Sequence, residues 1–464
     1  MKKKSNQKLK LTVSEILGRA LNWGFMLVAA LFLEVQDYGY FSLIVSLETL
    51  LSVVMVGGID RGAMRFLADK TESIDRRTVY FSWLLFSFLP VFIVFCVGDF
   101  SDVFVRYKVS HELIPVFVAG LFLVAQTRLF CTISRAENRS DYFFINRVVT
   151  IVLKIAVFVF FIRLGENVVE AYLYSMLLSS MVSLVMIPRI TSSKNIEVSF
   201  NENKIRNLYR YSLPFLPHMV AGSLVAFSDR FILEYYIDAS SVGVYSFAYM
   251  LGSSISLVYA IVALTYEKEL FSVSANFERV VILQETYYRF LNQVAFLFFI
   301  FLVIGIYYLP DYTELAKSDG FLEITVMVFF SSVFHTVYLK ASYFLAVEKK
   351  SIYIASSTMI SLVINIGCNI FLIPRFGMLG AAYATVLSYI LLSLIVSLIV
   401  VLKTEYKIFT KVTIFYMVLS ITCMGLSYLN IYYSVFLALI VSLLESKKML
   451  KSATHFFLGK DGGW

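Results

Sequence analysis

Six basic side chains lie inside runs of apolar residues: Arg19, Arg128, Lys154, Lys340, Arg147 and Arg289. A charge at the centre of a bilayer costs about 2.5 to 3.5 kcal/mol on insertion scales, so such a residue faces a bundle interior or pairs with a neighbour. Guanidinium and ammonium groups in a wet cavity replace the hydration of a phosphate-type anion. Alternatively, Arg147, Arg289 and Arg128 extend to the inner headgroups, for which Lys154 lies too deep.

Two carboxylates lie in the same apolar runs. Glu15 is four residues before Arg19, so the two either form an i,i+4 pair or Arg19 faces a cavity. Glu48 lies near the middle of its run. It either exchanges a proton or holds sodium during transport, or it stays neutral and hydrogen-bonds a backbone carbonyl. A lone carboxylate leaves the coupling ion open.

Asp229 and Arg230 stand side by side in the segment AFSDRFILEYY. Adjacent helical residues diverge by about 100°, so we expect them not to pair well with each other and to find separate partners. They act either as an outer gate between two halves or as a static brace. Lys340 and His335 are offset by about 140° on one helix, so at most one faces a shared cavity, and Lys340 is preferred.

Composition defines the elements that position these residues. The chain of 464 residues is 59% hydrophobic and 16% charged, with a mean hydropathy of +0.78. This gives it more apolar surface than the core of one soluble protein can bury. Runs of about twenty apolar residues predict transmembrane helices. We predict an all-α polytopic membrane protein with about fourteen of them, at 13–33, 40–58, 79–98, 113–133, 143–163, 168–188, 212–234, 243–264, 288–309, 321–346, 352–374, 378–402, 409–428 and 431–447.

Loop charge predicts the orientation. With both termini in the cytoplasm, most Lys and Arg fall in inner loops, and the outer ones are Arg106, Lys108, Arg163, Lys317 and Arg375. The net charge of +8 then fits anionic inner-leaflet lipid and requires no nucleic acid. The N-terminal apolar run is long enough to span and lacks a small-residue cleavage site, so we predict a retained helix rather than a signal peptide.

Two internal echoes indicate repeated halves. FLEVQDYGYFS at 32–42 resembles ILEYYIDASSVGVYS at 232–246, and IRLGENVVEAYLYS at 162–175 resembles IPRFGMLGAAYATVLS at 373–388. The spacing predicts two pseudo-symmetric six-helix halves, 1–200 and 201–405, around a central cavity, followed by two further helices and a cytoplasmic tail at 406–464.

Proline and glycine predict where helices bend. Pro214 and Pro217 lie in LPFLPH, where they either form a hinge for alternating access or occupy the first turn of a helix. Pro374 is expected to close one helix, and Gly377 and Gly380 to allow a tight outer turn.

Short motifs give no support for an enzyme, a cofactor or a metal. The cysteines are scattered singly, the histidines form no ligand pair, and no phosphate-binding glycine loop or nucleophile motif occurs. The longest predicted outer loop, about 99–112, is too short for a catalytic domain. We therefore expect a protein that is not an enzyme.

Three segments carry a family resemblance: YGYFSLIVSLETLLSVVMVGGIDRGAMRF, LPFLPHMVAGSLVAFSDRFILEYYIDASSVGVYSFAYML and NIGCNIFLIPRFGMLGAAYATVLSYI. They resemble the Wzx-type polysaccharide flippases of the multidrug/oligosaccharidyl-lipid/polysaccharide (MOP) exporter superfamily. The resemblance implies transfer of undecaprenyl-pyrophosphate-linked oligosaccharide to the outer leaflet of the bacterial plasma membrane, for O-antigen, lipopolysaccharide or capsule assembly. It also implies a cationic lumen, coupling to a cation gradient, and polysaccharide polymerase and chain-length proteins as partners.

Three other functions are left open. A lipid II flippase is a near relative with similar chemistry. A multidrug cation exporter of the same superfamily would favour buried acids, which the intramembrane Lys and Arg oppose. A membrane polysaccharide polymerase would require a large outer loop with catalytic residues.

Overall fold

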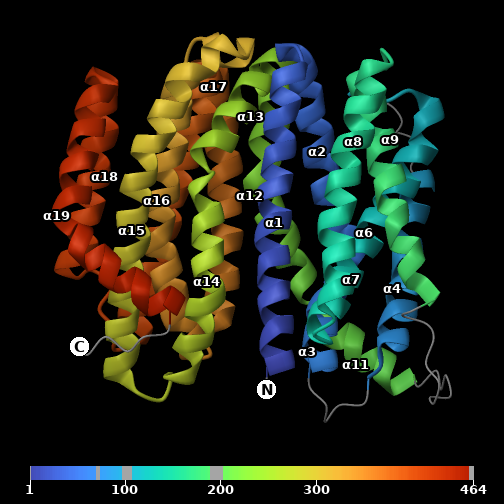
Figure 1. Ribbon diagram of the computed structural model, residues 1–464, viewed down its shortest axis with the longest axis horizontal. Helices are drawn as coiled ribbons and strands as arrows, with labels where there is room; N and C mark the ends of the chain where they lie inside the picture. The colour runs from blue at the N-terminus through green and yellow to red at the C-terminus, as the bar shows by residue number, and fades with distance from the viewer. Residues whose placement is uncertain (1, 69–73, 97–106, 189–201, 459–464) are drawn as a thin grey trace. The chain divides into compact units, whose positions relative to one another are not determined.

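The computed structural model describes residues 2–68, 74–96, 107–188 and 202–458, and every regular element in these ranges is helical (Figure 1). The all-α prediction is confirmed. The long helices are α1 Lys2–Phe32, α2 Val35–Val56, α3 Ile59–Ala68, α4 Arg76–Cys96, α6 Ile114–Ala136, α8 Thr150–Arg163, α9 Val168–Ser180, α11 Glu202–Ser212, α12 Phe215–Tyr236, α13 Ala239–Gly252, α14 Ile255–Ser272, α15 Phe277–Tyr308, α16 Phe321–Val347, α17 Ser351–Lys403, α18 Lys411–Leu429 and α19 Ile431–Leu458. The short ones are η1 His111–Leu113, α7 Ser140–Phe144, the π-helical turn η2 Ile145–Val149, η3 Met181–Met186, η4 Leu309–Asp311 and η5 Glu314–Lys317.

Within the described residues, nine helices are long and apolar enough to cross a membrane, or ten if the bent pair α13 and α14 forms one span. One of the nine is α17, whose 53 residues would be roughly 80 Å long if straight. This is more than twice the hydrocarbon thickness of about 30 Å. Because α17 breaks at Gly377, we count it as two spans. The total of fourteen stays a prediction, and Arg106 lies outside the described residues.

The helices form two compact units. Unit 1 comprises residues 1–29 and 37–227, and unit 2 comprises residues 30–36 and 228–464. In unit 1, α9 packs against both α6 and α8, and α8 and α9 lie side by side (Figure 1). The predicted repeat boundary near residue 200 comes from sequence echoes and stays a prediction.

An aromatic cluster fixes four helices of unit 1. Phe25 of α1 lies 5.2 Å from Phe158 of α8 and 5.5 Å from Phe41 of α2, measured between ring centroids. Phe41 in turn lies 5.4 Å from Tyr172 of α9 in an edge-to-face contact. All four rings are buried. Such pairs add about 0.5 to 1.5 kcal/mol each beyond their buried area, so they hold α1, α2, α8 and α9 in a fixed relation.

Two amphipathic helices, α3 and α11, occupy segments for which the apolar-run rule predicts only loops. They pack closely because Gly62 has no side chain to meet Ser212 and Leu208 of α11. The guanidinium of Arg65 lies 4.4 Å from the ring centroid of Tyr211. The rule misses both helices because their polar faces lower their mean hydropathy.

The two prolines lie at a helix junction. Helix α11 ends at Ser212 and α12 begins at Phe215, so Pro214 lies in the connecting turn and Pro217 in the first turn of α12. A proline in the first turn removes an N–H that has no helical partner. This placement corresponds to the first-turn alternative, and a hinge motion stays a prediction.

The glycines of the echo between 162–175 and 373–388 mark matching turns. Gly165, between α8 and α9, has φ of +85°, and Gly377, at the break in α17, has φ of +59°. Helices also break after Phe32 and after Tyr236, at the corresponding points of the other echo. The sequence echoes therefore correspond to repeated local structure. The predicted tight turn at Gly377 and Gly380 is confirmed, since a Cβ on Gly380 would overlap the backbone carbonyl of Leu372.

We expect Gly380→Ala to destabilise the protein. The added methyl meets a backbone oxygen that cannot move away without opening the turn, and overpacking of this kind costs about 1 to 3 kcal/mol. Gly367→Ala is the matched control, because no atom lies within 4 Å of a Cβ built on that residue of the same helix. Thermal unfolding in detergent should show a lower melting temperature for Gly380→Ala only. Equal melting temperatures for the two variants would contradict the tight-turn account.

Candidate functional site: a cationic cavity in unit 1

A cavity of about 490 Å³ opens within unit 1. Its charged lining residues are Arg19, Arg61, Arg128, Arg135, Arg147 and Lys154, with Glu15, Glu48 and Asp60. The six bases and three acids leave a formal excess of three positive charges. Four of the six bases predicted from the sequence, Arg19, Arg128, Arg147 and Lys154, thus come together in one place.

Glu15 is the centre of an arginine cluster. Its carboxylate accepts a hydrogen bond from Arg19 Nε at 2.8 Å and one from Arg135 Nη2 at 3.0 Å, and Arg147 Nε lies 3.7 Å away. Arg19 therefore forms the i,i+4 pair and also lines the cavity. Three guanidiniums facing one carboxylate leave positive charge uncompensated, so this wall attracts a further anion.

A glycine lets Arg147 reach this cluster. A Cβ on Gly18 of α1 would lie 2.6 Å from Arg147 Cγ, so the arginine stem packs directly on the helix backbone beside Glu15. Because Gly18 has no side chain, the stem of Arg147 can lie against α1, and η2 comes close to that helix. The absence of a side chain at residue 18 therefore helps to place Arg147 at the cavity.

Lys154 forms a second cluster with Glu48 and Tyr172. Its Nζ lies 3.0 Å from Glu48 Oε2 and 2.8 Å from the hydroxyl oxygen of Tyr172, and that hydroxyl also donates to Glu48. One alternative for Glu48 was a hydrogen bond to a backbone carbonyl. The contacts observed for its carboxyl group are instead with the side chains of Lys154 and Tyr172. Lys154 does not snorkel, because its side chain is only 15% exposed and its ammonium group pairs with Glu48 within unit 1.

The third charged contact joins α6 to α3. Arg128 Nε lies 3.7 Å from Asp60 Oδ2, and Arg61 lines the cavity beside them. The Arg128 side chain is 36% exposed and Asp60 is largely buried, so the arginine reaches from the protein wall into the cavity. An anion there can approach Arg128 without displacing a short hydrogen bond.

The other two predicted bases belong to unit 2. Lys340 is fully buried, with Nζ 2.5 Å from Glu285 Oε1, 2.9 Å from Thr413 Oγ1 and 3.3 Å from the carbonyl oxygen of Ile408. Arg289, on α15, lies close enough to the Tyr416 phenol to interact with it electrostatically. Neither lines the cavity of unit 1. His335 stacks on Tyr338, with the ring centroids 5.1 Å apart.

Asp229 and Arg230 tie α12 to α13 within unit 2. The Tyr245 hydroxyl donates to Asp229 Oδ2 at 2.5 Å, and Arg230 Nε donates to Ser246 Oγ at 3.1 Å. The expectation that each finds a separate partner agrees with these two bonds, but the two residues also contact each other, since Arg230 Nη1 lies 3.4 Å from Asp229 Oδ1. The long arginine side chain bends back, and its own backbone N–H also donates to that oxygen at 2.9 Å. These contacts link α12 to α13, and both the gate role and the static-brace role stay predictions.

Three lining residues were not predicted from the sequence: Arg135, Arg61 and Asp60. Each lies near a helix end, where a charged residue is typical of a loop. One signal was available. Arg128 and Arg135 are seven residues apart on α6, which is about two turns and places them on one face.

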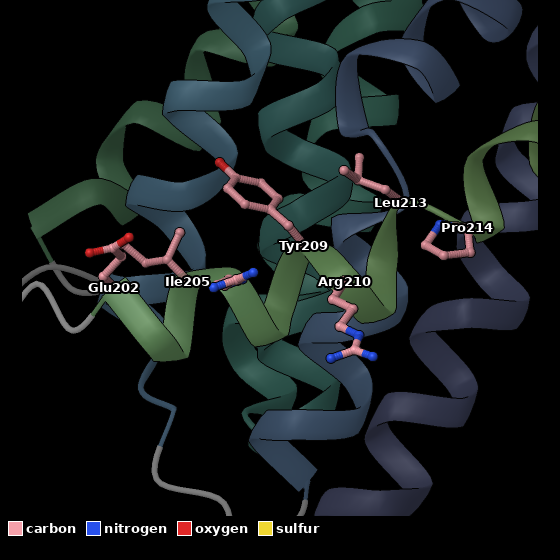
Figure 2. Close-up of a pocket in the computed structure, with 7 residues that line it drawn as sticks. Glu202, Ile205, Tyr209, Arg210, Leu213 and Pro214 are labelled. Atoms are coloured by element: carbon pink, nitrogen blue, oxygen red, sulfur yellow. The ribbon is translucent and has the colours of Figure 1, made fainter.

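A second hollow of about 810 Å³ lies on the outside of α11 (Figure 2). Its lining residues are Glu202, Ile205, Arg206, Tyr209, Arg210, Leu213 and Pro214. Figure 2 shows Tyr209 and Arg210 pointing to opposite sides of the helix, and the Tyr209 hydroxyl donates to the carbonyl of Ser82 on α4 at 2.5 Å. This hollow is lined by one helix and the turn after it, so the cavity enclosed by several helices is the better candidate site.

Solved structures show the same fold. A structure described as the lipid II flippase MurJ in an inward closed conformation has a TM-score of 0.65 and 15% identity, covering 97% of this chain and 99% of its own. An inward-facing multidrug resistance MATE family transporter of the MOP superfamily also has a TM-score of 0.65, with 16% identity, covering 83% of this chain and 92% of its own. The similarity establishes the fold of MOP-superfamily proteins.

Sequence comparison gives the family. An uncharacterized membrane protein of Methanocaldococcus jannaschii is 24% identical over 395 residues, which cover 77% of this chain and 76% of that protein. The model of the family described as "Polysaccharide biosynthesis protein" matches residues 8–265, more than half of the chain, including all the lining residues of the cavity. The chain therefore belongs to the polysaccharide biosynthesis protein family.

Proposed function

We propose that this protein is a flippase for undecaprenyl-pyrophosphate-linked oligosaccharide repeat units. It moves them from the inner to the outer leaflet of the bacterial plasma membrane by alternating access, with both termini in the cytoplasm. The oligosaccharide would serve O-antigen, lipopolysaccharide or capsule assembly, where a polymerase and chain-length proteins take it up. Family membership and the resemblance to Wzx-type flippases support this substrate class.

The observation that carries the proposal is the charge of the cavity. Its six bases exceed its three acids, and three of the bases converge on one carboxylate. A diphosphate leaving water needs such partners, since an unpaired charge in an apolar medium is prohibitively costly. A multidrug cation exporter needs the opposite sign, so the cavity favours an anionic lipid headgroup. A lipid II flippase shares the pyrophosphate chemistry and is the second candidate, supported by the MurJ fold.

Coupling to a cation gradient is part of the proposal, and the second cluster supports it. When a phosphate oxygen binds Lys154, Glu48 loses the ammonium group that compensates its charge. The buried carboxylate then needs another cation to compensate its charge. Substrate binding would thus favour binding of the coupling cation, a proton or sodium, at Glu48, and Tyr172 would keep the carboxyl group in place.

We expect Lys154→Ala to block transport. The variant lacks the ammonium group that lies 3.0 Å from Glu48 at the cavity wall, so lipid-linked repeat units should accumulate on the cytoplasmic face while protein levels stay normal. Expression in a host lacking its own flippase, with surface glycan and lipid-linked intermediates measured, tests this. Lys317→Ala is the control, because Lys317 pairs with Glu314 and is 52% exposed. Wild-type surface glycan in Lys154→Ala would refute the anion-binding role.

A further inference from the structure

Three lining residues of the cavity carry buried polar atoms without a hydrogen-bond partner: Asn146 Oδ1, Arg147 Nε and Thr150 Oγ1. Among the described lining residues, such atoms occur on these three alone. They are close together in sequence, on the π-helical turn η2 and the first residue of α8. Leaving a buried polar atom unpaired costs about 1 to 3 kcal/mol, so the arrangement points to a partner supplied by a ligand.

The π-helical turn lies directly before Thr150, whose hydroxyl is one of these unpaired atoms. The backbone N–H of Thr150 bonds to the carbonyl of Ile145, five residues back, instead of four. Elsewhere on the cavity wall the threonine hydroxyls bond their own helix: Thr127 donates to the carbonyl of Leu123 at 2.8 Å and Thr132 to that of Arg128 at 3.2 Å. Thr150 makes no such bond. Single π-turns inside α-helices are frequent at functional sites, in agreement with this difference.

The chemistry of Asn146 selects the kind of ligand. Its amide nitrogen donates to the carbonyl of Tyr142 at 3.0 Å, and because a carbonyl only accepts, the free atom must be the oxygen. That oxygen is an acceptor and requires a donor. A fully ionised diphosphate has no donor to offer, whereas a sugar hydroxyl has one. Asn146 is 2% exposed and Thr150 is 8% exposed, so both are part of the wall rather than of an open surface.

The position of the pair fits a sugar joined to a phosphate. Asn146, Thr150 and Lys154 follow one another at four-residue intervals, roughly 6 Å along the helix, and all three line the cavity. At one end of this stripe Arg147 joins the Glu15 cluster, and at the other Lys154 joins Glu48. A neutral hydrogen-bonding patch therefore lies between two cationic clusters. In a lipid-linked oligosaccharide the first sugar is bonded directly to the diphosphate, so its hydroxyls reach this patch when the cations hold the phosphates.

We propose that Asn146 and Thr150 form a sugar subsite that recognises a hydroxyl group of the first sugar, with the two side chains turning to it as the ligand binds. The inference rests on the proposed function, because it assumes that the cations hold the diphosphate. It predicts that the cavity distinguishes a sugar-bearing lipid from the bare lipid, and that these two residues are responsible.

The experiment compares two probes on purified protein in lipid nanodiscs: undecaprenyl diphosphate, and undecaprenyl diphosphate carrying one N-acetylhexosamine. Thr150→Val and Asn146→Leu should each weaken binding of the sugar-bearing lipid about fivefold, the equivalent of one hydrogen bond, and leave the bare lipid unaffected. Thr150→Ser should bind as the wild type does. Thr127→Val is the matched control, since its hydroxyl already bonds its own helix in the same cavity, and it should change neither affinity.

The outcomes separate the two proposals. Equal losses for both lipids, or no loss for either, would overturn the sugar subsite while the wild type still binds the diphosphate. If the wild type binds neither lipid, the proposed function fails and the subsite fails with it. A Thr150→Ser variant that binds as poorly as Thr150→Val would also overturn the role of the hydroxyl group.

Discussion

Glu15→Gln is expected to lose about 3 kcal/mol of stability and to regain it when undecaprenyl diphosphate is added. The carboxylate, 6% exposed, faces Arg19, Arg135 and Arg147 at 2.8, 3.0 and 3.7 Å, and the neutral amide leaves these guanidiniums without a counter-ion. Breaking a buried ion pair from one side costs about 3 to 5 kcal/mol, and the partial exposure of the arginines places this case at the lower end. A diphosphate in the cavity replaces the missing charge.

Thermal unfolding in detergent, with and without the lipid, measures this effect. Glu314→Gln is the control, since Glu314 pairs with Lys317 at 2.7 Å on the surface and such pairs contribute about 0 to 1 kcal/mol. The lipid should raise the melting temperature of Glu15→Gln more than that of the wild type or the control. A Glu15→Gln protein that melts as the wild type does, or one that the lipid does not stabilise, would show that Glu15 does not hold the arginine cluster.

Glu285→Ala should destabilise unit 2 by about 3 to 5 kcal/mol. It removes the carboxylate 2.5 Å from the fully buried Lys340 and leaves an ammonium group with the Thr413 hydroxyl, the Ile408 carbonyl and the face of the Tyr288 ring, none of which carries a compensating charge. The double variant Glu285→Leu with Lys340→Met removes both charges and should recover most of the stability, because an apolar pair of similar size is often as stable as a buried ion pair.

The same double variant tests what Lys340 does. If the pair serves the packing of α15 against α16, the double variant keeps its transport activity once it folds. The measurements are unfolding in detergent and surface glycan in cells. A stable double variant without transport would assign Lys340 to the substrate path, and an Glu285→Ala protein as stable as the wild type would contradict the buried pair.

Much of the architecture follows from the sequence because apolar runs of membrane length have few alternatives. One glycine turn also follows from the sequence: Gly377, which has a positive φ, and Gly380 form the predicted tight turn. The rule that an apolar run of membrane length predicts a helix does not find the amphipathic helices α3 and α11, since they are neither long nor apolar throughout. Helix π-turns such as η2 have no recognised sequence signal, so the unpaired atoms of Asn146 and Thr150 could not be predicted.

Charge partners were harder to predict than charged positions. Lys154 and Lys340 both stand in apolar segments of the sequence, yet Lys154 lines a cavity and Lys340 is fully buried. Their carboxylate partners, Glu48 and Glu285, lie 106 and 55 residues away along the chain, so only packing brings each pair together. Periodicity within one helix does carry information, as the seven-residue spacing of Arg128 and Arg135 shows, but it says nothing about which helix lies opposite.

We propose that the bases of the unit 1 cavity bind a lipid-linked diphosphate. Native mass spectrometry of the purified protein with undecaprenyl diphosphate tests it most directly, using a variant with Arg19, Arg128 and Arg147 all replaced by glutamine. We expect a lipid adduct on the wild-type protein that is lost from the triple variant, with binding of a neutral lipid unchanged. An equally abundant diphosphate adduct on a folded triple variant would contradict it.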